Sequence, residues 1–324
     1  MSFFRGRWVL SDRETTRVFV DCDPGIDDAV ALAYLAARPE VEILGVGAVF
    51  GNNTVAVTAQ NALRLLELYG RPEVPVAVGA ERPLVQAPRL AEHVHGGNGL
   101  GDVELPDPKG EPVAESAAEL LVRLARENPG ELDVLAVGPL TNVALAIGLE
   151  PRLPQLVRRL VVMGGAVEVA GNVGSHAEAN IVNDPEAAEA VFAAGFDLDL
   201  VALDITMKTV ATAEWLDRLK EVPGDRAERT SAFLDFYAEF YKGIFGLRQC
   251  AMHDPLAAAV LADPHLVTEA FEAPVRVELT GTLTRGMTVA DRRPRPRTDE
   301  RRACRVVTSV SEDAFLDLML DALR

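Results

Sequence analysis

The stretch VFVDCDPGIDDAVALAYLAA, residues 18–37, decides the fold. It begins with the short apolar run 18–20, turns at Pro24–Gly25 and continues as an Ala- and Leu-rich segment, 27–37. A buried run, a turn and a helix-like segment are typical of the first strand–helix unit of an α/β protein. We therefore expect a strand that ends just before the turn and a helix that begins just after it.

The same alternation continues along the chain. Further short apolar runs are found at residues 41–50, 74–78, 132–137, 160–163 and 198–203. Helix-like segments stand between them, at residues 55–69, 115–127, 142–149 and 185–194. Strands in parallel sheets are apolar on both faces, because helices cover both faces. The pattern predicts the α/β class, with a single doubly wound, mostly parallel sheet and flanking helices.

The pattern changes after about residue 206. Helices are predicted at 214–220, 227–244, 254–261 and 312–323, and late strands at 275–279, 287–290 and 305–308. The Arg- and Pro-rich stretch 291–302 is predicted to be an exposed loop. No long linker divides the chain, so we expect one domain at residues 17–324, preceded by an N-terminal extension at residues 1–16.

Composition excludes several classes of protein. The 324 residues carry 32 Lys and Arg against 49 Asp and Glu, a formal charge of −17, so neither nucleic acid nor an anionic membrane is an expected partner. The three distant cysteines, Cys22, Cys250 and Cys304, fit neither a disulfide framework nor a zinc site. No apolar run approaches the ~18 residues of a membrane helix, and the N-terminus does not resemble a signal peptide. We expect a cytoplasmic protein.

Four carboxylates crowd the turn after the first strand: Asp21, Asp23, Asp27 and Asp28. Ligands of open α/β sheets bind beyond the carboxyl ends of the strands. Capping explains one or two acids at a helix N-terminus, not four within eight residues. Like charges this close repel and need a cation to remain ionised. Oxygen ligands favour Ca²⁺ or Mg²⁺; the alternative is a capped helix with solvated acids.

An Asp-x-Asp pair after a first strand also resembles a haloacid-dehalogenase-type phosphatase with an Asp nucleophile. That family has Thr or Val where Gly25–Ile26 stand, and a later lysine with an acidic pair. Lys208 is the only lysine between Lys109 and Lys220, and no acidic pair accompanies it. The turn also lacks the glycines and lysine of a nucleotide P-loop.

DCDPGIDDAVAL, residues 21–32, resembles the N-terminal signature of the inosine–uridine nucleoside hydrolase family, DTDPGIDDA, with Cys22 in place of Thr. Other elements recur in the order of that family: GNN at 51–53, HGGNGLG at 95–101, GPLTN at 138–142, MGGA at 163–166, AEAN–NDPEAA within 177–188, MHDP at 252–255 and LTRGMTV at 283–289. Together they cover the chain from residue 18 to 289. The resemblance implies a hydrolase that splits ribonucleosides into ribose and free base.

The resemblance also implies residue roles. Calcium would be held by Asp23, Asp28, the carbonyl oxygen of Val137 and Asp254. Met163 would contact the substrate, and the ribose hydroxyls would be bound by Asp27, Asn52, Asn172, Glu178 and Asn180. This chemistry is consistent, because positive charge develops on the ribose and surrounding carboxylates stabilise it. A metal-activated water needs a base, and Asp23 is the candidate.

The leaving base needs an acid, and His253, next to Asp254, is the first candidate. His95 is the second candidate for the base pocket. Tyr237 and Tyr241 lie four residues apart, hence on one helix face. Such a pair fits a core or a base pocket about equally, and relatives carry tyrosines there.

Histidine rather than tryptophan at position 253 resembles the pyrimidine-cleaving and broad-specificity branches. Relatives are dimers or tetramers, which implies a homodimer or homotetramer whose partner is a small ribonucleoside. A non-catalytic nucleoside- or sugar-binding protein is the third hypothesis, although binding alone needs neither a metal nor an acid.

Overall fold

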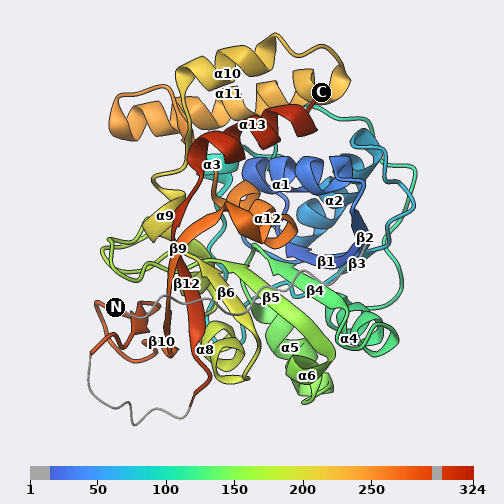
Figure 1. Cartoon of the computed structure of the whole chain (residues 1–324). Coiled ribbons are helices and arrows are strands. Elements are labelled where there is room, and N and C mark those ends of the chain that lie inside the picture. The colour runs from blue at the N-terminus through green and yellow to red at the C-terminus, as the bar shows by residue number, and fades with distance from the viewer. Residues whose placement is uncertain (1–14, 294–300) are drawn as a thin grey trace.

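The computed structural model describes residues 15–293 and 301–324. Its centre is an eight-stranded sheet (Figure 1). The strand order is β3 (Val76–Val78), β2 (Val41–Ala48), β1 (Thr16–Cys22), β4 (Leu132–Ala136), β5 (Val157–Met163), β6 (Leu198–Val201), β12 (Cys304–Val310) and β9 (Val267–Ala273). Every neighbouring pair is parallel except β12 and β9, which are antiparallel. The predicted doubly wound, mostly parallel sheet is confirmed.

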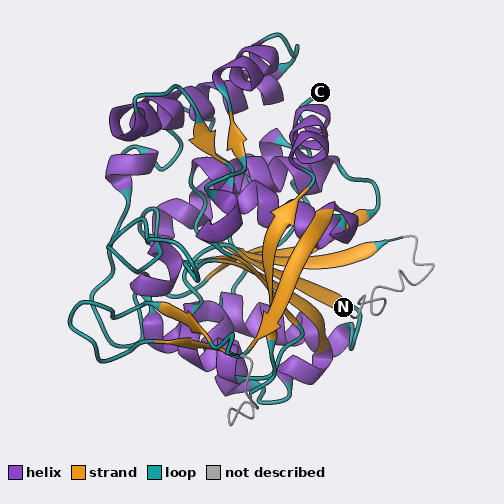
Figure 2. Cartoon of the chain, turned by 60° about the vertical axis from the view of Figure 1, so that its left-hand side comes forward, coloured by secondary structure: helices purple, strands orange, loops and turns teal. Residues whose placement is uncertain are grey.

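Helices cover both faces of this sheet (Figure 2). One layer contains α1 (Ile26–Ala37), α2 (Val55–Leu68), α12 (His253–Ala262) and α13 (Glu312–Ala322), with α10 (Ala213–Lys220) and α11 (Asp225–Phe245) outside them. The opposite layer contains α4 (Ala117–Glu127), α5 (Thr141–Leu149), α6 (Leu153–Leu156) and α8 (Pro185–Ala193). Side chains alternate between faces along a strand, so Val18 and Val20 enter one apolar core while Phe19 enters the other.

The remaining elements are short. They are α3 (Glu92–His95), α7 (Ala179–Asn183), α9 (Leu203–Thr206), the 3₁₀ turn Pro264–Leu266 and two small antiparallel sheets, β7 (Val210–Ala211) with β8 (Cys250–Ala251) and β10 (Val275–Val277) with β11 (Thr288–Ala290). Two of the predicted late strands thus pair with each other and stay outside the main sheet. Strand β9 lies in a stretch where we expected no strand.

The strand order reverses between β1 and β4, because β2 and β3 extend from β1 one way and β4 to β6 the other. Ligands of doubly wound sheets bind in the crevice at this reversal. The acidic turn follows β1, and Val137 follows β4; the main-chain N–H of Val137 donates to the carbonyl oxygen of Asp21 at 2.8 Å. The predicted acids therefore lie where the topology places a ligand.

Some expectations fall on residues outside the described part. The expected extension 1–16 overlaps residues 1–14, and the expected loop 291–302 overlaps residues 294–300. Within the described residues, no helix combines the length and apolar character needed to cross a membrane. The three cysteines are free thiols, and all three are buried.

Candidate active site

The acidic turn is held by a small set of N–H donors. The Asp28 carboxylate accepts the main-chain N–H of Asp23 at 3.2 Å and that of Gly25 at 2.9 Å. The side-chain amide of Asn52 donates to Asp28 at 3.0 Å, and its main-chain N–H donates to Asp23 Oδ2 at 2.7 Å. The loop after β2 is thus bonded to the turn after β1, which brings Asn52 beside the two acids.

Burial makes these acids hold their protons more tightly. It raises the pKa of Asp27 to about 8 and that of Asp28 to about 6, with the charge of Asp28 adding to the rise at Asp27. Burial and the Asp28 charge also raise the pKa of Asp23, and burial and the neighbouring acids raise that of Asp254. Asp23 Oδ1 and Asp27 Oδ1 are buried without a hydrogen-bond partner. Such a cluster is stable as carboxylates only with a cation present.

One group of acids has the spacing of metal ligands. Oxygens of Asp27, Asp28 and Asp254 all lie within 4.8 Å of one another. The all-oxygen donor set and the partnerless oxygens fit a hard divalent cation. This group differs from the ligand set that the resemblance implies, because it includes Asp27 and leaves out Asp23. Asn52 binds Asp23 Oδ2, and Asp23 Oδ1 lies close to Gly138, where an added Cβ would be 2.7 Å away.

On the base side, four side chains form a continuous series of contacts that runs between Asp27 and Asp254. His95 Nδ1 lies 4.0 Å from Asp27 Oδ1, and its ring centroid is 5.5 Å from that of Tyr237. The rings of Tyr237 and Tyr241 meet edge to face at 4.9 Å. The Tyr241 hydroxyl lies 2.9 Å from His253 Nε2, and His253 precedes Asp254 in the chain. The four residues predicted for the base side are therefore joined to one another and to the acids by direct contacts.

Both histidines in this series of contacts, His95 and His253, are buried and neutral. Burial lowers the pKa of His253 to about 4 and that of His95 to about 3. Tyr237 and Tyr241 are also buried, and burial raises the pKa of each hydroxyl. The side chains on this side are therefore uncharged at neutral pH.

A second arm of the site comes from β4, β5 and α7. The amide nitrogen of Asn180 donates to the carbonyl oxygen of Val137 at 2.8 Å and to that of Met163 at 3.2 Å. The buried Glu178 carboxylate accepts main-chain N–H groups from Gly165 and Asn180, each at 2.9 Å. Its charge contributes to the raised pKa of Asp27, so the two arms face each other.

Asn172 lies apart from these two arms. It is exposed, and its amide oxygen accepts the main-chain N–H of Ala179 at 3.0 Å. That bond ties the preceding loop to the start of α7, next to Glu178 and Asn180.

Sequence reasoning missed two partners of the site. Thr206 Oγ1 lies 2.7 Å from His253 Nδ1, so both ring nitrogens of His253 are engaged. Asn142 donates to Asp21 Oδ1 at 2.8 Å and to the carbonyl oxygen of Ala48 at 3.1 Å. Asn142 is the last residue of the segment GPLTN, 138–142, but no local pattern assigns it a partner on β1 or β2.

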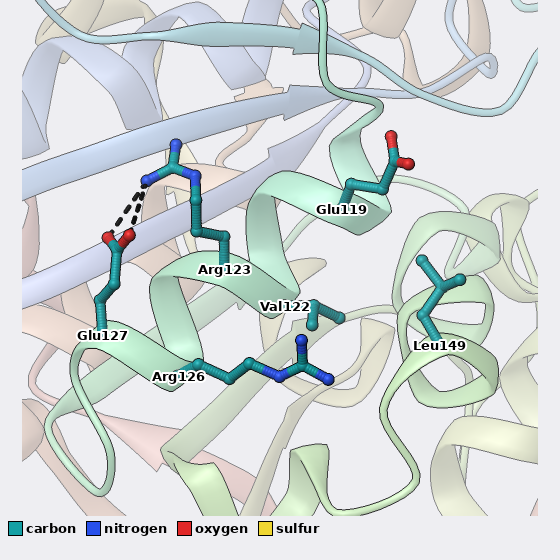
Figure 3. A pocket seen from close by; sticks show the side chains of 6 residues that line it. All are labelled: Glu119, Val122, Arg123, Arg126, Glu127 and Leu149. Carbon is teal, nitrogen blue, oxygen red and sulfur yellow. Dashed lines mark hydrogen bonds and ion pairs between the residues drawn. The ribbon is translucent and has the colours of Figure 1, made fainter.

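A surface groove of about 560 Å³ lies on the outer side of α4 (Figure 3). Its lining contains both signs of charge, and these charges pair with one another or with near neighbours: Arg123 with Glu127, and Arg126 with Glu150. None of the acids of the turn lines it. The groove is therefore separate from the site at the strand-order reversal.

Comparisons with known proteins agree with this geometry. The sequence model described as inosine-uridine preferring nucleoside hydrolase matches residues 18–317. A probable uridine nucleosidase 1 from Oryza sativa subsp. japonica is 43% identical over 276 residues, 85% of each chain. The inosine-uridine preferring nucleoside hydrolase of Crithidia fasciculata is 39% identical over 310 residues, 95% of this chain and 97% of that one.

A solved structure has the same fold. It is a purine-preferring ribonucleoside hydrolase from Gardnerella vaginalis, with a TM-score of 0.89 at 31% identity, covering 95% of this chain and 98% of that one. With the family model matching most of the residues described, the chain belongs to the inosine-uridine preferring nucleoside hydrolase family.

Proposed function

We propose that the chain hydrolyses ribonucleosides to ribose and free base with a Ca²⁺ ion held at the acidic turn. As a family member, it is a hydrolase acting on N-glycosyl compounds. The observation that carries the calcium proposal is the buried group of Asp27, Asp28 and Asp254, with partnerless oxygens on Asp23 and Asp27. Family membership favours this reaction over the phosphatase and the binding-protein alternatives.

The proposed ligands are Asp23, Asp28, Asp254 and the carbonyl oxygen of Val137. Asp27 lies close enough to Asp28 and Asp254 to share the ion as well as the ribose. A carbonyl oxygen has two lone pairs, so Val137 can accept from Asn180 and still offer an electron pair. A divalent cation held there supplies a Lewis acid that lowers the pKa of water and grips sugar hydroxyls.

The residues of the chain perform the remaining steps. Asp23 accepts a proton from the attacking water, since its Oδ1 is free of other partners. Glu178 and Asp27 stabilise the positive charge that develops on the ribose ring. Asn52 and Asn180 orient the ribose hydroxyls, which keeps the anomeric carbon in line with the water. Asn172 supports them by holding the main chain at the start of α7.

On the leaving-base side, we propose that His95, Met163, Tyr237 and Tyr241 contact the base and that His253 supplies its proton. A His253 ring that is already protonated before the reaction is disfavoured, because burial lowers the pKa of His253 to about 4. Protonation therefore proceeds through the hydrogen-bonded unit of Tyr241 and His253, whose hydroxyl and ring nitrogen lie 2.9 Å apart. In this unit a solvent proton passes through His253 to the base as the glycosidic bond breaks, His253 returns to its neutral form, and Asp23 releases to solvent the proton that it took from water. We propose a pyrimidine-preferring or broad specificity, which His253 supports.

A nucleoside panel tests the function. Uridine, cytidine, inosine and adenosine are assayed for free ribose in metal-free protein, after calcium addition and after magnesium addition, with p-nitrophenyl phosphate as the phosphatase control. We expect ribose release only with the metal, best with calcium, and no phosphate release. Full activity in rigorously metal-free protein would disprove the metal role. Turnover of purine nucleosides alone would refute the specificity and leave the hydrolase assignment intact.

We also propose that the protein works in the cytoplasm as a homodimer or homotetramer. The three buried free thiols support a reducing compartment. Sedimentation equilibrium tests the assembly: a monomer at all micromolar concentrations would contradict it.

A further inference from the structure

Helix α1 receives one cap from its own first turn, where the Asp28 carboxylate accepts the main-chain N–H of Gly25 at 2.9 Å. Gly25 is its N-cap residue and offers no side-chain hydrogen bond. The main-chain N–H of Ile26, the first residue of the helix, instead donates to Nδ1 of His95 at 3.1 Å. A Cβ at Gly25 would lie 2.7 Å from that nitrogen and 2.6 Å from the Asn52 amide. The N–H of Ile26 is thus capped by a residue 69 positions later in the chain.

The capped turn is the one that carries Asp27 and Asp28. Asp28 has three N–H donors of its own, from Asp23, Gly25 and Asn52. Asp27 Oδ1, by contrast, has no hydrogen-bond partner. The position of Asp27 therefore depends on the main chain of the first turn, and His95 holds that main chain.

His95 is itself firmly placed. Its main-chain N–H donates to Ala91, its carbonyl accepts from Gly101 at 2.7 Å, and its side chain is buried. The loop after it is joined to the acidic turn by Asn61, whose amide donates to the carbonyls of Pro24 at 3.2 Å and Asn98 at 2.8 Å. The main chain of His95 is thus fixed beside the helix end, and its buried ring has little room to turn away.

We propose that His95 is a positioning residue that caps the N–H of Ile26 in α1 through Nδ1 and thereby fixes Asp27 for the cation. A nitrogen that accepts a hydrogen bond carries no proton, so the ring is held neutral with its proton on Nε2. The part that concerns the cation rests on the proposed function, whereas the cap and the tautomer do not. His95 acts through the turn, which is a different role from donating a proton to the leaving base.

Three substitutions at one position separate this role from general packing. In His95→Asn, the amide oxygen takes the place of Nδ1 and can accept the Ile26 N–H; in His95→Gln, the amide lies where Nε2 was; His95→Ala removes both. Calcium affinity is measured by isothermal titration, alongside KM and kcat for uridine. His93→Ala is the matched control, since His93 is on the same short helix but exposed.

We expect His95→Ala and His95→Gln to weaken calcium binding about tenfold, equivalent to ~1.4 kcal/mol. The calcium affinity of His95→Asn should stay within about threefold of the wild-type value. His93→Ala should bind like wild type. Equal losses in the Asn, Gln and Ala variants, or no loss in Ala, would overturn the proposal.

The tautomer is tested on the wild-type protein alone. Long-range ¹H–¹⁵N spectra of ¹⁵N-histidine-labelled protein should show one ring protonated on Nε2 only from pH 5 to 8, and that signal should vanish in His95→Asn. A proton on Nδ1 would refute the cap even if every alanine variant failed to fold. Failure to bind calcium at all, with the expected tautomer present, would instead refute the proposed metal and leave the cap standing.

Discussion

Main-chain N–H groups and asparagine amides hold the carboxylates of the acidic turn. Asp28 receives three such bonds, and Asp21 receives one from Asn142. These donors are neutral, so they orient the acids without cancelling their charge. A lysine or arginine in their place would pair with the carboxylates and neutralise them, so that a divalent cation would no longer be needed. The donors therefore preserve the negative potential that a cation site requires.

Substitution by asparagine should lower kcat much more at Asp23 than at Asp21. In Asp23→Asn the amide cannot take a proton from water, so kcat for uridine should fall about 10²–10⁴-fold. Asp21→Asn keeps an oxygen for the Asn142 amide, so kcat should stay within about tenfold. Steady-state kinetics at saturating calcium measure both, with circular dichroism as the check on folding. Comparable losses in the two variants would place the base elsewhere.

His253→Ala tests leaving-group protonation. The variant loses the bonds to Tyr241 and Thr206, so turnover of uridine should drop about 10²-fold or more. p-Nitrophenyl riboside has a leaving group that needs no acid, so its hydrolysis should be largely spared. The ratio of the two kcat/KM values is the informative quantity. Equal losses on both substrates would show that His253 positions Asp254 instead.

The loop from β2 to α2 should tolerate no side chain at Gly51. Gly51 has a φ of 155°, and a Cβ there would lie 2.0 Å from Asp23 Oδ2. We expect Gly51→Ala to lower kcat/KM at least about tenfold, since Asp23 must move and each factor of ten needs only ~1.4 kcal/mol. The matched control is Gly148→Ala in α5, where nothing lies within 4 Å. It should keep full activity and unfold at the same or a higher temperature, because alanine favours helix by ~1 kcal/mol.

The elements that the sequence predicted well are those buried on both sides. The predicted run 132–137 covers β4, whose five residues are all buried, because a parallel interior strand leaves an unbroken apolar signal. Strand β9 reads VTEAFEA and is mostly exposed at the edge of the sheet. Its glutamates interrupt the apolar residues, so the stretch contains no apolar run that would predict a strand. Helices of four or five residues, such as α9, are too short to show a period.

The candidate site likewise contains features that the sequence can predict and features that it cannot. Acids adjacent in sequence, such as Asp27 and Asp28, were predicted because crowding is visible in the chain itself. The bonds from Asn142 to Asp21 and from Thr206 to His253 join residues 121 and 47 positions apart. The parallel pairing of β1 with β4 brings the first pair together, and the antiparallel pairing of β7 with β8 brings the second together, so no local pattern predicts either.

The whole molecule should lose stability as pH rises when the metal is removed. Burial raises the pKa of Asp28, Asp21 and Asp27 to about 6, 7 and 8, above the ordinary 3.8. The folded state then binds more protons than the unfolded state from about pH 4 to 8, so the free energy of unfolding falls across that window. Bound calcium favours the charged carboxylates and offsets the loss.

Calorimetry at pH 5 and pH 8, with chelator and with calcium, checks this expectation. In chelator, Tm should be higher at pH 5 than at pH 8. Calcium should raise Tm at pH 8 by about 5 °C or more and by less at pH 5, where protons compete for the same oxygens. A calcium effect independent of pH would show that other groups control the linkage.

The position of β12 between β6 and β9 has a consequence for how the protein is made. During translation the ribosome releases β1 to β6 well before β12, which is the next strand of the sheet beside β6. Until then the nascent chain carries an open, apolar strand edge, the kind of surface that pairs with other chains. Asp254 also emerges late, so a half-made chain has most of its sheet but not its full set of acids. We therefore expect stalled or truncated products to depend on chaperones and to be inert toward nucleosides.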